Sequence, residues 1–298
     1  MSKPVIHSLP SSAGDAARLA ALLGTAMHAV DVHRFPDGEL RVTVGPVTPT
    51  TIVYASLDQP NDKLLSLLFA AEALRRGGAT RLVLLAPYLC YMRQDTAFHA
   101  GEAISQKVIG RMIGETFDRV ITVDAHLHRT RNIEDVFPKI EAEDLSAMPA
   151  IADFLGAHGL AAGTIVVGPD AESEPWVRDL ARRLSADFAV ARKVRHGDRS
   201  VEMSFADPSV FRGRPAVLVD DIVSSGGTVL ACAKALRAAG AISVDAVISH
   251  ALFPPDMTGT FMKGGLASVR STHSVPHPTN AIVLDAMFAE ALRKEFTA

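Results

Sequence analysis

Short apolar runs rich in β-branched residues alternate along this chain with segments in which apolar residues recur at helical spacing. Strands that alternate with helices in this way are typical of parallel α/β units. The alternation therefore predicts two successive α/β sets, one in each half of the chain. The predicted strands cover 51–56, 81–86, 120–123, 164–167, 216–219 and 244–249.

Helices are predicted between these strands. Asn61 is expected to cap the first of them, because Asn is a favoured N-cap residue. Ser173 is expected to cap a helix in the second half, with Trp176, Leu180 and Leu184 on one face. The other predicted helices cover 104–117, 228–239 and 281–296.

The domain organisation follows from the similarity of the two sets. A chain of 298 residues is long enough for about two domains. Apolar periodicity lapses between 141 and 150, so we place an N-terminal domain over 1–145 and a C-terminal domain over 146–298. The predicted fold class is α/β, with two similar domains that each contain a mainly parallel sheet flanked by helices. The last helix could pack on either domain.

Composition narrows the possible partners. With 48% hydrophobic residues the chain can bury a large core, and a formal charge of −3 argues against a nucleic-acid partner. The first ten residues lack the apolar run of a signal peptide, and no uncharged apolar stretch reaches 18 residues, so no membrane contact and a cytoplasmic location are expected. Cys90 and Cys232 lie far apart in apolar contexts and are expected to be reduced core thiols.

The segment VLVDDIVSSGGTV, residues 217–229, contains the most specific chemistry. Asp220 and Asp221 are expected directly after a buried strand, where they could accept hydrogen bonds from a vicinal diol. The following turn, 224–228, supplies hydroxyls and backbone N–H groups at a helix start, which suits a phosphate. The alternative is an acidic turn and an N-capped helix without a ligand. The segment predicts a site for a phosphorylated sugar.

A second polar cluster lies in the long segment after strand 81–86. Arg93, Gln94 and Asp95 combine a guanidinium, an amide and a carboxylate, a set that suits the base and phosphates of a nucleotide. Loops of this length are usually functional or mobile. The alternative is a solvated loop without a ligand.

The segment after strand 120–123 contains two histidines. In an extended backbone Asp124, His126 and His128 would point to one side, where His126 or Asp124 could contact a metal ion or a phosphate-bound magnesium ion. A zinc site is an alternative, but no third ligand group accompanies the two histidines at a recognisable spacing. A structural role is favoured more for His128 than for His126.

Two further groups of charges follow strand ends in the second half. Asp170 follows strand 164–167, whereas Glu172 and Glu174 are explained by the start of the next helix. Lys193 and Arg195 alternate and could both face a phosphate, although a run of charges is more often a solvated face.

Seven motifs follow one another along the chain. They are RFPDGE at 34–39, YMRQD at 91–95, GEAIS at 101–105, TVDAHLH at 122–128, GPDA at 168–171, the pair at 193 and 195, and VDDIVSSGGT at 219–228. Taken in this order, they resemble the ribose-phosphate pyrophosphokinase family, the synthetases of 5-phosphoribosyl 1-diphosphate (PRPP). The resemblance covers roughly 30–250 and implies two phosphoribosyltransferase-like domains. It also implies transfer of the β,γ-diphosphoryl group of ATP to the 1-hydroxyl of ribose 5-phosphate, with Mg²⁺ as cofactor and AMP as product.

The resemblance also implies roles for particular positions. A homo-oligomer follows, because one family loop reaches the adenine of a neighbouring subunit. Positions implied for ribose 5-phosphate are Asp220, Asp221, Ser224, Ser225, Gly226, Gly227 and Thr228. Positions implied for ATP are Arg93, Gln94 and Asp95, together with Phe35, Asp37 and Glu39 of the loop that reaches the neighbour. His126 and Asp170 are implied for magnesium, and Lys193 and Arg195 for catalysis.

The chain departs from the family pattern at several positions. Ser224 stands where an aspartate is common, and Glu172 and Ser173 stand where a glycine pair is common. The segment 96–100 has fewer basic residues than is usual, which leaves control by phosphate open. Two other functions therefore remain open: a phosphoribosyltransferase that consumes PRPP, and a non-catalytic regulatory subunit that resembles the synthetase.

Overall fold

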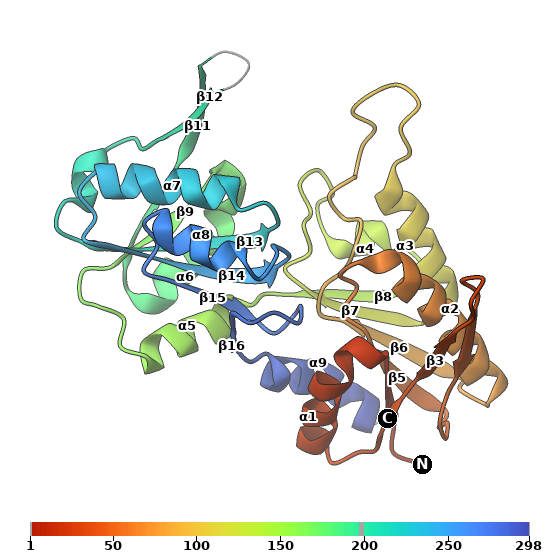
Figure 1. Ribbon diagram of the computed structural model, residues 1–298. Helices are drawn as coiled ribbons and strands as arrows, with labels where there is room; N and C mark the ends of the chain where they lie inside the picture. The colour runs from red at the N-terminus through yellow and green to blue at the C-terminus, as the bar shows by residue number, and fades with distance from the viewer. Residues whose placement is uncertain (1, 197–199, 298) are drawn as a thin grey trace. The chain divides into compact units, whose positions relative to one another are not determined.

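The computed structural model describes residues 2–196 and 200–297 and divides the chain into two compact units (Figure 1). Each unit is an α/β domain with its own six-stranded parallel sheet. Within the described residues no helix combines the length and the apolar character needed to cross a membrane. Unit 1 comprises Met1–Leu145, Ser274–Pro276 and Leu284–Ala298, and unit 2 comprises Ser146–His273 and His277–Val283.

The sheet of unit 1 has the strand order β2-β1-β5-β6-β7-β8, with every pair parallel. All five residues of β7 are buried, as expected for a strand that is covered on both faces. The strands are β1 Val5–Ser8, β2 Met27–Ala29, β5 Thr50–Tyr54, β6 Arg81–Ala86, β7 Arg119–Val123 and β8 Glu141–Leu145. The helices are α1 Ala13–Leu23, α2 Pro60–Arg76, α3 Ser105–Thr116, α4 Ile133–Val136 and α9 Asp285–Thr297, and β3 Asp31–Arg34 and β4 Leu40–Thr43 form a separate hairpin.

The sheet of unit 2 has the order β10-β9-β13-β14-β15-β16 and is also parallel. The hairpin of β11 and β12 projects from the rest of this unit (Figure 1). The strands are β9 Ile165–Gly168, β10 Asp187–Val190, β11 Arg192–His196, β12 Ser200–Ser204, β13 Pro215–Val223, β14 Ser243–Ala251, β15 Ser268–Thr272 and β16 Asn280–Ile282. The helices are α5 Met148–Ala157, α6 Glu174–Leu184, α7 Gly227–Ala238 and α8 Met257–Lys263.

The predicted fold class is confirmed, and all six predicted strands exist. The segment 141–150, where apolar periodicity lapses, is nevertheless regular: it contains β8 and the beginning of α5. Strand β8 has the sequence EAEDL, whose acidic side chains interrupt an apolar pattern, and no strand was predicted there. The last helix begins at Asp285, because residues 280–282 form β16, and it belongs to unit 1.

One helix prediction was wrong, and a second is refined by the structure. Asn61 does not cap α2, because the helix begins at Pro60, whose fixed φ suits the first helical position. Trp176, Leu180 and Leu184 share one face of α6, as predicted. Of these three, Leu180 is buried, together with Val177 and Ala181, whereas Trp176 and Leu184 are half-buried beside it.

Both cysteines are reduced thiols in the core, as predicted. Cys90 and Cys232 are buried and unpaired. Burial raises the pKa of each thiol to about 12, so neither forms an appreciable amount of thiolate near neutral pH. Neither cysteine is therefore a candidate nucleophile.

A buried group of charges joins α9 to the sheet of unit 1. Arg119 is 1% exposed and donates to Glu295 at 2.8 Å and to Glu143 at 2.6 Å. Arg81 donates to the same Glu295 carboxylate at 2.7 Å. Burial raises the pKa of Glu295, but the hydrogen bonds from Arg81 and Arg119 outweigh it, and the net pKa is lowered. The packing of α9 therefore depends on an ionised glutamate.

Replacing Arg119 should destabilise the fold strongly. We expect Arg119→Met to lower the free energy of unfolding by about 3 kcal/mol, because Glu295 loses a buried partner. Because the pKa of Glu295 is lowered, its contribution is complete above the ordinary value of 4.5 and is lost as the pH falls through the folded-state pKa. The difference between variant and wild type, measured by urea unfolding, should therefore shrink in acid.

The matched control is Arg293→Met, since Arg293 pairs with Glu290 on the exposed surface of the same helix. That change should alter the free energy of unfolding by no more than about 0.5 kcal/mol. Equal effects of the two substitutions would contradict a special role for the buried cluster.

Candidate functional site

The parallel register of unit 2 brings three sequence-distant segments to one edge of its sheet. Val190 of β10 lies opposite Gly168 of β9, and Val167 of β9 lies opposite Leu218 of β13. β10 and β9 therefore end side by side, and β13 runs on past both to Val223. The residues just beyond these positions, Asp170, Lys193 and Asp220, are candidate site residues from three separate motifs.

Charges at this edge interact directly. Lys193 Nζ donates to Asp170 Oδ2 at 2.9 Å. Burial raises the pKa of Asp220 well above its ordinary value, the negative charges of Asp221 and Asp170 raise it further, and Lys193 partly opposes the shift. Acidic charge is thus in excess at this edge, which favours a bound cation or a hydroxyl group that donates hydrogen bonds.

The two adjacent aspartates do not form the predicted pair. Strand β13 runs on to Val223, so Asp220 and Asp221 lie inside the strand rather than after it, and their side chains point to opposite faces. Asp221 is 5% exposed, and its Oδ1 accepts the N–H of Ile222 at 2.8 Å. Asp220 therefore faces the candidate site. Asp221 affects the pKa of Asp220, which its charge raises and a hydrogen bond from its backbone lowers.

The turn between β13 and α7 has the geometry of an anion site. Gly226 has φ +71° and precedes the first residue of α7, so free backbone N–H groups lie at the helix start. In the part of the chain that the structure describes, the hydroxyls of Ser224, Ser225 and Thr228 make no hydrogen bond. Hydroxyls and N–H groups are therefore available together on one short turn.

The turn after β9 explains one departure from the family pattern. The Ser173 side chain is buried, and its Oγ donates to the Asp170 carbonyl at 2.6 Å instead of capping α6. A Cβ on Gly168 would lie only 2.2 Å from this Oγ, so Ser173 packs into space that only a glycine leaves open. Ser173 thus points inward, whereas Glu172 is exposed.

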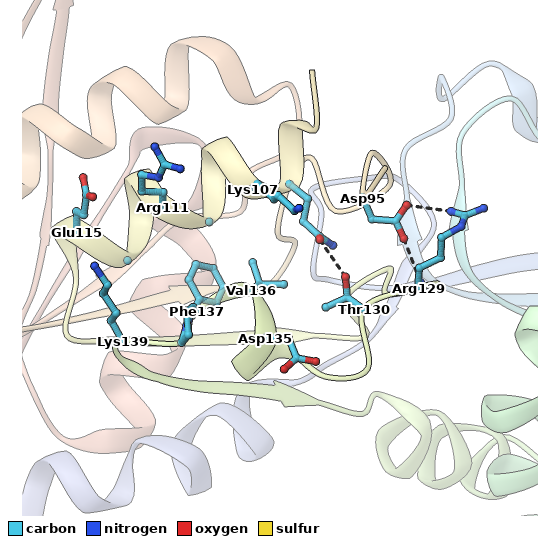
Figure 2. Close-up of a pocket in the computed structure, with 14 residues that line it drawn as sticks. Asp95, Lys107, Arg111, Glu115, Arg129, Thr130, Asp135, Val136, Phe137 and Lys139 are labelled. Carbon is cyan, nitrogen blue, oxygen red and sulfur yellow. Dashed lines mark hydrogen bonds and ion pairs between the residues drawn. The ribbon is translucent and has the colours of Figure 1, made fainter. Parts of the chain in front are cut away.

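The nucleotide cluster predicted in unit 1 is more ordered than a solvated loop. Arg93 is exposed, and Gln94 Nε2 donates to the Thr96 carbonyl at 3.2 Å. The Asp95 carboxylate is 1% exposed and accepts from the backbone N–H of Arg129 at 3.0 Å and from its guanidinium at 2.9 Å (Figure 2). Asp95 therefore supports the loop from within, and its partner Arg129 lies in no predicted site.

A cavity of about 580 Å³ lies beside this ion pair, between α3 and the segment 129–139 (Figure 2). The two walls can approach closely because Gly110 has no side chain. A Cβ at that position would lie only 2.8 Å from Val136 Cγ1. Lys107, Arg111 and Lys139 line the cavity and form no ion pair within the described residues. Sequence reasoning missed this cavity, because its cations are spread over 33 positions and follow no motif.

The two histidines after β7 lie together, but not by the predicted extended backbone. Asp124 has φ +39° and is buried, which breaks the alternation. The rings of His126 and His128 are 3.8 Å apart between centroids and nearly perpendicular. No group of three His, Cys, Asp or Glu residues suited to a metal occurs among the described residues.

The loop of the β3–β4 hairpin presents the remaining predicted nucleotide residues. The N–H of Phe35 donates to the Glu39 carbonyl at 2.8 Å, and Asp37 Oδ1 accepts the N–H of Glu39 at 3.1 Å. The Phe35 ring is 38% exposed at the tip of the hairpin. The side chain of Arg195, the second predicted catalytic residue, lies outside the described part of the chain.

Comparison with known proteins first defines the class. Residues 5–116 match the N-terminal domain of ribose phosphate pyrophosphokinase, and residues 159–258 match a phosphoribosyl transferase domain. The solved structure of phosphoribosylpyrophosphate synthetase from Mycobacterium smegmatis has the same fold, with a TM-score of 0.87 over 99% of both chains at 23% identity. The protein is therefore built from two phosphoribosyltransferase-like α/β domains.

Curated relatives then specify the family. The ribose-phosphate pyrophosphokinase of Methanopyrus kandleri is 32% identical over 92% of this chain and 94% of its own. Ribose-phosphate pyrophosphokinase 2 of Archaeoglobus fulgidus is 30% identical over 94% of this chain and 97% of its own. The chain belongs to the ribose-phosphate pyrophosphokinase family, and its activity is PRPP synthesis by diphosphoryl transfer. The resemblance drawn from the seven motifs is confirmed.

The turn before α7 yields a test. Gly226→Ala should lower the free energy of unfolding by about 3 kcal/mol, because a side chain at positive φ is strained and its Cβ would lie 2.4 Å from the buried Phe261 ring. Gly227→Ala is the control, since its Cβ would meet only Ser225 Oγ at 3.9 Å. Urea unfolding measures both, and an equally stable Gly226→Ala variant would contradict the constraint.

Proposed function

We propose that the chain transfers the β,γ-diphosphoryl group of ATP to the 1-hydroxyl of ribose 5-phosphate and releases AMP. The main support is the edge of unit 2, where Asp170, Lys193 and Asp220 lie beside the anion-binding start of α7. We assign the nucleotide-binding loops to the domain over 1–145 and the ribose 5-phosphate site to the domain over 146–298.

The ribose 5-phosphate site is proposed at the turn before α7. The 5-phosphate would accept hydrogen bonds from the N–H groups and hydroxyls of residues 225–228, namely Ser225, Gly226, Gly227 and Thr228. Asp220 would accept a hydrogen bond from a ring hydroxyl. The negative charge of Asp221 would help to keep the pKa of Asp220 raised. Ser224 provides a hydroxyl where the family commonly has a carboxylate, so this site has one charge fewer.

The ATP site is proposed around the segment 93–95. Arg93 is exposed and free to contact phosphate, and Gln94 can contact the base or the ribose. Asp95 is assigned a supporting role because its carboxylate already binds Arg129. The hairpin residues Phe35, Asp37 and Glu39 are proposed to contact the adenine bound by a neighbouring copy, which makes the enzyme a homo-oligomer.

Lys193 and Arg195 are proposed to neutralise charge on the transferring group. Diphosphoryl transfer leaves little covalent chemistry to the protein, so positioning and charge stabilisation carry the rate. The ammonium of Lys193 is held by Asp170 and is 42% exposed, so a phosphate can replace that carboxylate as its partner. The 1-hydroxyl oxygen then forms a bond to the β-phosphorus, the bond between the β-phosphorus and the α-phosphate oxygen of AMP breaks, and the hydroxyl proton is released to solvent.

Magnesium is proposed as the cofactor, and the donor set suits it in part. Mg²⁺ prefers oxygen ligands and usually binds one or two carboxylates together with substrate phosphates. Asp170 provides one such carboxylate, and a cation would oppose the rise in the pKa of Asp220 that burial and the charges of Asp221 and Asp170 cause. The imidazole of His126 is a poor magnesium ligand, so we assign it contact with a phosphate or a metal-bound water. When bound, the ion would neutralise charge on the diphosphoryl oxygens.

A direct assay tests the proposal against its alternatives. Purified protein with ATP, ribose 5-phosphate and Mg²⁺ should give AMP and PRPP in equal amounts, measured by chromatography. A phosphoribosyltransferase would instead consume added PRPP with a free base. A non-catalytic subunit, which Ser224 favours, would form no AMP with any divalent metal, with or without inorganic phosphate. Either of these results would refute the proposal.

Lys193→Ala should separate binding from chemistry. We expect kcat to fall about a hundredfold while the Kd for ribose 5-phosphate changes little, because the lost cation acts mainly in the transition state. Arg192→Ala is the matched control, since neighbouring residues of β11 point to opposite faces. Equal losses in kcat and in ribose 5-phosphate affinity would argue against a transition-state role.

A further inference from the structure

We propose that Arg129 is a positioning residue for ATP: it holds the segment 93–102 in the conformation that presents Arg93 and Gln94 to the nucleotide. The inference rests on the proposed assignment of 93–95 to the ATP site. Arg129 lies just beyond the TVDAHLH motif and belongs to none of the seven motifs. Its importance follows only from its contacts in unit 1.

The first contact fixes Asp95 at two points. The backbone N–H of Arg129 and its guanidinium each donate to a different oxygen of the Asp95 carboxylate, at 3.0 and 2.9 Å (Figure 2). The carboxylate is 1% exposed, whereas the arginine side chain is 59% exposed. A carboxylate buried to this degree requires charged or polar partners. Asp95 is adjacent to Gln94, so its orientation determines where Arg93 and Gln94 point.

The second contact supports the distal part of the same loop. The Arg129 guanidinium lies over the Phe98 ring, 5.4 Å from its centroid, a cation–π geometry. The N–H groups of Phe98 and His99 both donate to Glu102 Oε2, at 2.9 and 3.2 Å. Arg129 thus contacts a loop tip that is already closed by Glu102, and it connects this tip to Asp95.

The neighbouring residue reinforces the loop where it meets α3. Thr130 Oγ1 donates to Gln106 Oε1 at 3.0 Å (Figure 2). Gln106 in turn donates its side-chain amide to the Met92 carbonyl at 3.4 Å and its backbone N–H to the Gln94 carbonyl at 3.2 Å. Residues 129 and 130 therefore contact the loop near its start, at its tip and where it enters α3.

Arginine suits this position for a physical reason. A planar guanidinium can pair with a carboxylate at its edge while its face stacks on an aromatic ring. Lysine can replace the ion pair but lacks the planar surface. Lysine at this position should therefore recover part of the function, whereas alanine should recover none.

The test compares Arg129→Ala, Arg129→Lys and the control Arg131→Ala. Arg131 is exposed, carries the same charge and makes no ion pair within the described residues. With AMP formation as the readout, Arg129→Ala should raise KM for ATP about tenfold. KM for ribose 5-phosphate should stay within about twofold and Tm within about 2 °C, because Asp95 keeps the backbone N–H of residue 129 as a partner and removal of the exposed arginine side chain opens the carboxylate to water. Arg129→Lys should fall between alanine and wild type, and Arg131→Ala should match wild type.

Two results would overturn the inference. An unchanged KM for ATP in Arg129→Ala would do so, as would equal rises in both KM values accompanied by a large fall in Tm, the pattern of general destabilisation. The variant Arg93→Ala distinguishes a failure of this inference from a wrong assignment of the ATP site. If Arg93→Ala weakens ATP binding and Arg129→Ala does not, the inference alone fails. If neither does, the inference fails together with the proposed ATP site.

Discussion

The parallel pairing of β10, β9 and β13 is the constraint on which the candidate site of unit 2 depends. Parallel strands end at the same edge of a sheet, so residues that follow them meet there even when they are far apart in the sequence. This register places the lysine of one motif within 2.9 Å of the aspartate of another. A shift by one residue would turn every side chain of a strand to its other face and separate these charges.

Paired charges organise both units, and in several of these pairs one partner is buried. Arg119 in the core of unit 1 holds the carboxylate of α9, and the buried Asp95 carboxylate is held by an exposed arginine. Lys193 differs, because both it and Asp170 remain accessible. Buried pairs fix a conformation, since separating them is costly, whereas an accessible pair can exchange partners. Charged pairs with a buried partner therefore have a structural role, whereas the accessible pair of Lys193 and Asp170 is available to a ligand.

The departures from the family pattern have different structural consequences. Ser173 points inward against Gly168, and it therefore leaves the outer surface of the turn after β9 unchanged. Ser224 lies on the turn that forms the proposed sugar-phosphate site, so it changes the charge of that site directly. The segment 96–100, poor in basic residues, is closed by the Glu102 carboxylate. Of these positions, Ser224 is therefore the one that lies in the proposed sugar-phosphate site.

The sequence by itself determined the fold class, six of the twelve strands in the two parallel sheets, and the family, because burial on both faces produces apolar runs and ligand chemistry produces short motifs. It could not show β8, whose acidic residues pair with cations far along the chain, nor the continuation of β13 through Asp220 and Asp221. It also did not show that Asp95 binds Arg129, 34 positions away. These features arise from contacts between distant segments, and only the folded chain brings such segments within a few ångströms.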